Sequence, residues 1–331
     1  MSERALSSKA GSALNAGIGD KMTRLLDAAL LLLLLVVPLV APSFWTYILA
    51  LSLANAIGVL SVSVLIRYAG EVSIGQNFFI AVGAYALAIL QARLGVPFPV
   101  GAAFGALLGC LMGLAFAWPS RKLSGVYLSV ATLALGLCVP ELLLHWTDIT
   151  GGFEGMNVKP DLVAGVPGGI QQFYVALAGF AIVVIALARF RHSRYGIALL
   201  TARHHAKAAE AFGMPLASVR LLVFALSAGI AGFGGSILAF ASSTVSPNSF
   251  TFWSSVYLLV GSVVCLYSTK PSAAFFGGLF ITLLPQLLSD YGELVEIIYG
   301  FTLFAVIYLF NIALPHLRAA IRRKQARNGH G

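Results

Sequence analysis

Ten apolar stretches, each about as long as a membrane is thick, follow one another along this chain. Of the 331 residues, 59% are hydrophobic and only 10% are charged, whereas about a quarter of the residues in a soluble domain are charged. The sequence therefore predicts an all-α, polytopic membrane protein with about ten transmembrane or re-entrant helical segments. The third, fifth and ninth stretches contain glycine, proline or polar residues, which makes them candidates for broken or re-entrant helices. The stretches are 25–44, 45–66, 74–92, 98–118, 124–146, 172–190, 221–242, 252–268, 272–288 and 295–313.

The positions of lysine and arginine predict the orientation. With both termini in the cytoplasm, 19 of the 21 basic residues lie on the cytoplasmic side, and only Arg93 and Lys159 lie outside. This is the bias that the positive-inside rule describes. Topology and anionic membrane lipid account for the net charge of +9, so no nucleic-acid partner is expected. The predicted parts are a cytoplasmic N-terminal tail (1–24) that leads into an uncleaved first span, a membrane domain (25–315) with an outer loop (146–171) and a cytoplasmic loop (191–220), and a basic cytoplasmic tail (316–331).

A glycine repeats every fourth residue in the fourth stretch, which places one glycine ridge along a helix. Such a ridge lets two helices approach closely in lipid. Two interpretations stay open: packing against another helix of the same chain, or a seam against a second membrane subunit. The ridge consists of Gly101, Gly105, Gly109 and Gly113.

Polar residues inside the apolar stretches are candidates for a solute pathway, because polar groups in a membrane are costly and tend to serve function. Glu141 follows Pro140 near the outer end of the fifth stretch, where it either faces a polar pathway or is solvated at the interface. Gln76 and Asn77 either line a cavity or bond between helices, and the same holds for Asn55.

Motifs for catalysis are absent from the sequence. No lysine is followed by Ser or Thr, so the chain lacks the P-loop that binds ATP. The adjacent rings of His204 and His205 would point about 100° apart on a helix, which is poor metal geometry. Cys110, Cys138 and Cys265 lie in apolar stretches without a spacing motif. We therefore expect no enzyme activity, no metal and no cofactor in this chain.

Several stretches together resemble the inner-membrane permease of branched-chain amino-acid ABC transporters, LivM type. Residues 193–235 begin with SRYGIALLTARHHAKAAEAFGMP and contain an Ala-rich helix expected over 198–212, with Gly213 as its stop. The other stretches are GEVSIGQNFFIAVGAY (70–85), SGVYLSVATLALG (124–136), TGGFEG (150–155) and SPNSF (246–250).

The resemblance implies that the cytoplasmic helix docks into a separate ATPase subunit. It also implies a second, similar permease subunit, two ATPases that bind the ATP, and a periplasmic binding protein, all serving import across a bacterial inner membrane. The residues expected in ATPase coupling are Arg203, Lys207, Glu210, Ala211 and Gly213; those expected to dock the binding protein are Thr150, Gly151, Gly152, Glu154 and Gly155; Tyr127 and Thr132 join the candidate pathway.

Some positions depart from the family's pattern. His204 and His205 stand where the family often has two acids, and Leu137 and Pro140 stand where it often has Glu and Arg. Branched-chain amino acids are the first substrate prediction, and urea, amides or aromatic acids are the alternatives. The alternative class is a secondary transporter or channel that works without an ATPase.

Overall fold

The fold is that of an all-α membrane protein, as the apolar stretches predict. The computed structural model describes residues 27, 29–39, 41–120, 123, 125–159, 166–204 and 216–287, with a few positions between 297 and 308. Six helices in it are long and apolar enough to cross a membrane. They are α2 (Ser43–Ala69), α3 (Gln76–Leu94), α4 (Phe98–Ser120), α5 (Val126–His145), α7 (Gly168–His192) and α10 (Leu216–Ser242).

Shorter apolar helices accompany these six. They are Ala29–Leu39, α11 (Phe252–Val264) and α12 (Pro271–Leu287). Pro42 separates the first of them from α2, because its fixed φ and missing N–H favour the start of a new helix. These nine helices match the first nine predicted segments, and an all-α polytopic fold is confirmed; of the tenth segment, 295–313, only a few positions are described. The cytoplasmic placement of the termini stays a prediction.

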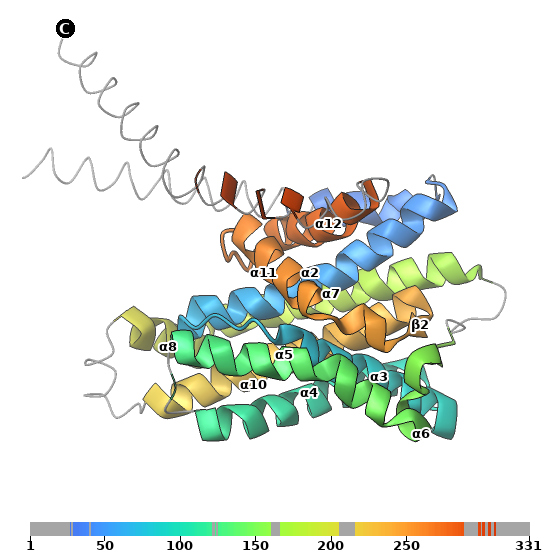
Figure 1. Cartoon of the computed structure of the whole chain (residues 1–331). Coiled ribbons are helices and arrows are strands. Elements are labelled where there is room, and N and C mark those ends of the chain that lie inside the picture. The colour runs from blue at the N-terminus through green and yellow to red at the C-terminus, as the bar shows by residue number, and fades with distance from the viewer. Residues whose placement is uncertain are drawn as a thin grey trace, which may run out of the picture.

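Two ends of the molecule carry the smaller elements (Figure 1). At one end α8 (Arg194–His204) follows α7 after a bend at Ser193. At the other end lie α6 (Thr147–Thr150), the 3-10 turns η1 (Gly152–Glu154) and η2 (Pro247–Phe250), and the strands β1 (Met156–Asn157) and β2 (Thr244–Val245). The strands pair antiparallel, with Met156 opposite Val245 and Asn157 opposite Thr244. Of these short elements, α6, η1 and β1 lie in the described part of the predicted outer loop 146–171.

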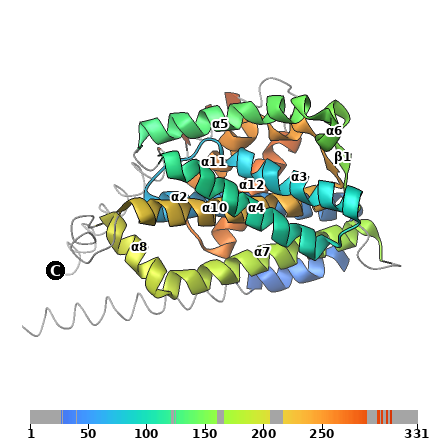
Figure 2. The same ribbon diagram turned by 90° about the horizontal axis from the view of Figure 1, so that it is seen from below.

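The centre of the bundle is α2, with α10 beside it. In the most hydrophobic window of α2, 83% of the residues are buried, against only 28% in α5. The apolar faces of α5 and α4 are therefore left at the outside of the chain, as expected where lipid or another membrane subunit takes the place of water. Figure 2 shows this arrangement from below, with α10 in the middle, α5 at one edge and α7 at the other.

The glycine ridge of α4 packs inside the chain, against α10 and α3. A Cβ on Gly109 would lie 2.6 Å from the carbonyl oxygen of Ala228, and one on Gly105 would overlap the Ser236 hydroxyl. The contact continues on α3, where a Cβ on Gly83 would overlap the carbonyl oxygen of Gly232. Gly101 meets Leu87 and Gly113 meets Ala228 in the same way. Of the two interpretations, the structure places the ridge in the same-chain contact.

The stretches with polar residues are not broken within their helices. α3 and α5 are continuous, and α5 runs through Pro140 without interruption. The irregular backbone instead precedes α3, in the non-helical segment Gly70–Gly75, in which Glu71, Ser73 and Gly75 are buried. Non-helical backbone at such depth is tolerated where protein surrounds it.

Candidate functional site

α3 begins deep inside the bundle rather than at its end. The Gln76 side-chain amide donates to the Ser61 hydroxyl at 3.0 Å and to the Ser227 hydroxyl at 2.9 Å. Ser227 in turn donates to the Ser61 carbonyl at 2.8 Å. Ser61 lies about two helical turns before the end of α2, at about 3.6 residues per turn. The segment Gly70–Gly75 therefore runs back into the bundle before α3 starts.

A second non-helical stretch enters from the opposite end and meets the first. The Asn77 backbone N–H donates to the Ser255 hydroxyl at 3.1 Å, and its side-chain amide donates to the Thr251 carbonyl at 2.9 Å. Thr251 is the residue before α11, so the N-termini of α3 and α11 meet inside the bundle. The N–H groups of a helix's first turn lack partners within the helix and carry partial positive charge. Two such ends form a polar spot among apolar helices.

A cavity of about 210 Å³ lies beside this meeting point. Asn55 and Asn77 supply amides to its wall, and Asn55 also donates to the Thr282 hydroxyl at 2.9 Å. Pockets for drug-sized ligands measure roughly 300–1,000 Å³, so this one suits a smaller solute. The other lining residues are Leu51, Ile80, Leu238, Ser249, Phe250, Ser254, Tyr257, Leu258 and Ile281.

The remaining predicted pathway residues lie on α5, away from this cavity. The Thr132 hydroxyl accepts from the Ile74 backbone N–H at 3.2 Å, so Thr132 holds the segment Gly70–Gly75 in place. Tyr127 and Glu141 are exposed on α5. Neither lines the cavity, and a pathway at these two residues requires a further subunit to cover α5. Sequence reasoning could not decide their direction, because the helix is apolar on nearly all sides.

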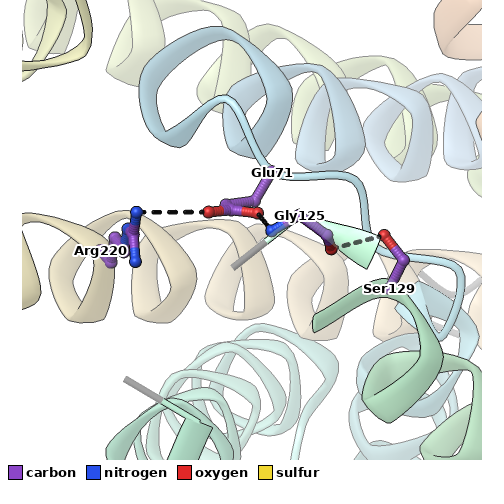
Figure 3. Close-up of polar contacts among 4 residues, drawn as sticks. All are labelled: Glu71, Gly125, Ser129 and Arg220. Atoms are coloured by element: carbon purple, nitrogen blue, oxygen red, sulfur yellow. Dashed lines mark hydrogen bonds and ion pairs between the residues drawn. The ribbon is translucent and has the colours of Figure 1, made fainter. Parts of the chain in front are cut away.

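Glu71 ties three parts of the chain together (Figure 3). Its carboxylate accepts from the Gly125 backbone N–H at 2.9 Å and lies 3.7 Å from the guanidinium of Arg220. Ser129 donates to the Gly125 carbonyl at 3.2 Å and to the Val72 carbonyl at 2.9 Å. The Glu71 side chain is 6% exposed and that of Arg220 35%.

This junction was missed in the sequence. The signal was an acid inside a largely apolar region directly after Gly70. Through it, the segment that leads to α3 contacts the N-terminal ends of α5 and α10. Arg220 is also the last residue of the predicted cytoplasmic loop 191–220.

Only part of the predicted coupling helix is described. It begins as α8 at Arg194 rather than near Ala198, because the Ser193 hydroxyl accepts the Gly196 N–H at 3.1 Å and caps the helix earlier. Arg203 donates to the Arg67 carbonyl. The other coupling residues lie outside the described residues, and their role stays a prediction: Lys207, Glu210, Ala211 and Gly213.

The predicted docking residues form a structured corner. The buried Thr150 hydroxyl donates to the Leu143 carbonyl at 2.7 Å and accepts from the Gly152 N–H at 3.2 Å. Gly151, Gly152 and Gly155 have φ values of 76°, 58° and 73°, which a side chain would strain. Phe153, 73% exposed, and Glu154 project from this corner. The structure therefore presents an apolar ring and a carboxylate on a rigid turn.

Within the described residues, no group of three or more His, Cys, Asp or Glu side chains gathers as it would around a metal ion. The polar groups of the cavity are amides and hydroxyls, which can bind a polar solute. None of them is a nucleophile paired with a base.

Comparison with known proteins gives the family. The family model described as branched-chain amino acid transport system / permease component matches residues 44–309. The high-affinity branched-chain amino acid transport system permease protein LivM of Escherichia coli K12 is 28% identical over 267 residues, which cover 73% of this chain and 63% of that protein. The probable branched-chain amino acid transport permease protein LivM of Methanocaldococcus jannaschii is 25% identical over 181 residues, 54% of this chain and 48% of that protein. The comparison with solved structures found no match. The chain is thus a multi-pass membrane protein that belongs to the family of permease components of branched-chain amino acid transport systems.

Proposed function

We propose that this chain is the transmembrane permease subunit of an ATP-driven ABC importer and carries branched-chain amino acids across the bacterial inner membrane. The observation that carries the proposal is the meeting of α3 and α11 beside a polar cavity, in a chain of this family. The proposed partners are a second homologous permease subunit, two cytoplasmic ATPases that bind the ATP, and a periplasmic binding protein.

The lining of the cavity suits a small solute with one polar and one apolar end. Positive helix N-termini favour a carboxylate group. The apolar part of the wall, formed by residues such as Leu51, Ile80 and Ile281, favours a branched hydrocarbon side chain. Urea or a simple amide would use only the polar part of this wall.

The Glu71 junction supports coupling between the cavity and the cytoplasmic loop. Arg220 stands between the predicted ATPase-docking residues and the rest of α10. A shift of this part of the loop would act on Glu71 and hence on the segment that ends at Gln76. ATP binding by the partner subunits would thereby favour one state of the cavity over another, as far as its differential affinity allows.

Reconstitution tests the proposal. The chain is purified with its proposed second permease, ATPases and binding protein, and the complex is placed in proteoliposomes. We expect uptake of radiolabelled leucine that requires both ATP and the binding protein. Uptake that persists without ATPase subunits contradicts an ABC importer and favours a secondary transporter or channel. ATP-dependent uptake of urea, an amide or an aromatic acid in place of leucine keeps the importer and changes its substrate.

Asn55→Leu is expected to lower uptake at least tenfold while the complex still assembles. The substitution removes an amide from the cavity wall but leaves Thr282 satisfied, because that hydroxyl also donates to the Gly278 carbonyl at 2.8 Å. The structural cost is therefore small. Leu51→Met, one turn away on the same wall, is the matched control and should transport normally. Equal uptake by both variants would remove the cavity from the pathway.

Gly152→Val is expected to reduce binding-protein-dependent uptake severalfold at normal protein levels. Gly152 has φ 58°, and a Cβ would lie 3.0 Å from Thr147, so valine would reshape the corner at a cost of about 1 kcal/mol or more. The control is Gly169→Val, where a Cβ would have nothing within 4 Å. The measurement is the affinity of the complex for its binding protein, together with uptake. Unchanged affinity in Gly152→Val would place docking elsewhere.

A further inference from the structure

A second cavity, unrelated to the solute cavity, lies where α2, α7 and α8 meet. Its volume is about 330 Å³. Arg67 and Tyr68 line it from the end of α2, Arg191 from the end of α7, and Ile197, Leu200 and Thr201 from α8. The pocket thus joins two guanidinium groups and two hydroxyls to an apolar wall. The proposed transport function uses none of these side chains.

The cationic groups of this pocket lack an anion. The Nε of Arg67 is buried and has no hydrogen-bond partner among the described residues. In the described part of the chain, no carboxylate lies within ion-pairing distance of Arg67 or Arg191. The nearby Glu71 contacts Arg220 instead. Two cationic side chains that line one pocket with no acid paired to them favour a bound anion that can accept several hydrogen bonds. A phosphate group has the oxygens that two guanidinium groups and a tyrosine can share.

The surroundings of the pocket fit a lipid rather than a free phosphate ion. α8 exposes Tyr195 (71%) and Ile197 (59%), the kind of side chains that lie at a membrane interface. The Phe190 ring is 5.5 Å from the Tyr68 ring and borders a second, apolar groove of about 370 Å³. That groove follows α7 through Leu187 and Ile182 towards the middle of the helix. Phe190 thus lines the groove and contacts Tyr68, a side chain of the headgroup pocket.

We propose that this pocket binds the phosphate of an anionic phospholipid, with Arg67 and Arg191 as the main headgroup contacts and the groove along α7 receiving one acyl chain. Basic pockets between membrane helices on the cytoplasmic side are suited to such headgroups. The lipid would link α2 to α8 at the point where the chain enters the predicted coupling loop. The proposal depends on the pocket alone, and it holds whichever solute the protein carries.

Native mass spectrometry of the full-length chain, released from detergent with added lipid, tests the proposal. We expect the fraction of the chain that retains phosphatidylglycerol to be at least tenfold higher than the fraction that retains phosphatidylcholine. Arg67→Gln/Arg191→Gln should remove this preference. The matched control is Arg189→Gln/Arg194→Gln, which removes the same charge from two exposed positions that do not line the pocket and should keep the preference. Equal phosphatidylglycerol binding by both double variants would overturn the site.

A second measurement, the melting temperature of the unmodified chain with and without lipid, tests the site even if a variant folds poorly. Phosphatidylglycerol should raise the melting temperature of the unmodified chain and of the Arg189→Gln/Arg194→Gln control by at least about 3 °C, because a ligand that binds only the folded state stabilises it. Inorganic phosphate at millimolar concentration should neither reproduce this shift nor displace the lipid. If it does either, the pocket binds a free anion and the lipid assignment is wrong. The absence of any shift in the unmodified chain would likewise overturn it.

Discussion

Gly83→Ala is expected to cause a large loss of stability, because the added methyl group would strike the backbone of a neighbouring helix. A Cβ at Gly83 would overlap the carbonyl oxygen of Gly232 and lie 2.6 Å from its Cα. α10 has little room to move, because Gly232 also packs closely against Gly105 and Gly109 of α4. Overpacking a well-packed interior costs about 1–3 kcal/mol, and a collision between two backbones belongs at or above the upper end. We therefore expect the free energy of unfolding to fall by at least about 3 kcal/mol.

The control is Gly169→Ala, also a glycine-to-alanine change within a helix. Its Cβ would meet nothing within 4 Å. Because alanine favours helix over glycine by about 1 kcal/mol, the control should be neutral or slightly stabilised, and only the collision can destabilise Gly83→Ala. Thermal unfolding in detergent and the yield of folded protein measure both. Equal melting temperatures would show that α3 and α10 are farther apart than this structure has them.

Arg220→Met should destabilise the protein more than Glu71→Gln, although both break the same ion pair. The Glu71 carboxylate is nearly buried, and removing Arg220 leaves it charged with one remaining donor, the Gly125 N–H. Arg220, 35% exposed, can reach water when Glu71 is neutral. Breaking a buried pair costs about 3–5 kcal/mol when the buried charge is the one left behind. The two groups are 3.7 Å apart and Arg220 is partly exposed. We therefore expect the free energy of unfolding to fall by about 3 kcal/mol in Arg220→Met and by about 1 kcal/mol in Glu71→Gln.

The double variant Glu71→Gln/Arg220→Met completes a cycle of four proteins. It should be more stable than Arg220→Met alone, because no uncompensated charge stays buried. Unfolding free energies of the four proteins give the coupling directly. If the two single changes add without coupling, the pair contributes nothing. If Glu71→Gln proves the more damaging change, the burial of the two side chains is the reverse of what is described here.

The apolar stretches predicted the helices well because length and hydrophobicity alone decide which segments can cross lipid. They could not predict that α3 starts deep in the bundle, since buried extended backbone is as apolar as buried helix. The bonds that fix this start join Gln76 to Ser227 across 151 positions of sequence. The spacing of the glycine ridge likewise predicted one face of α4 but not its partner, because the contact with α10 is formed only by the tertiary fold.

The candidate site was predicted in part. Asn77 was singled out as an intramembrane amide and does line the cavity. Glu141 and Tyr127 were singled out on similar grounds and lie on the exposed side of α5, because polarity indicates a special environment without giving its direction. Arg220 was counted only as a topogenic charge. Its partner, Glu71, comes from a distant part of the chain, which local patterns do not reveal.

The two-residue ribbon between β1 and β2 has a thermodynamic consequence. It joins the corner that carries Phe153 to the stretch that ends at Thr251, beside Asn77. A change of cavity shape that displaced Thr251 and the strand before it would therefore act on Met156 and Asn157 as well. Coupling between two binding sites is reciprocal. If a protein binds the corner better in one of the corner's positions, its binding changes the affinity of the cavity for its solute by a certain factor. The solute then changes the affinity of the corner for that protein by the same factor. In the proposed importer, loading of the cavity and docking at the corner would then share one coupling free energy.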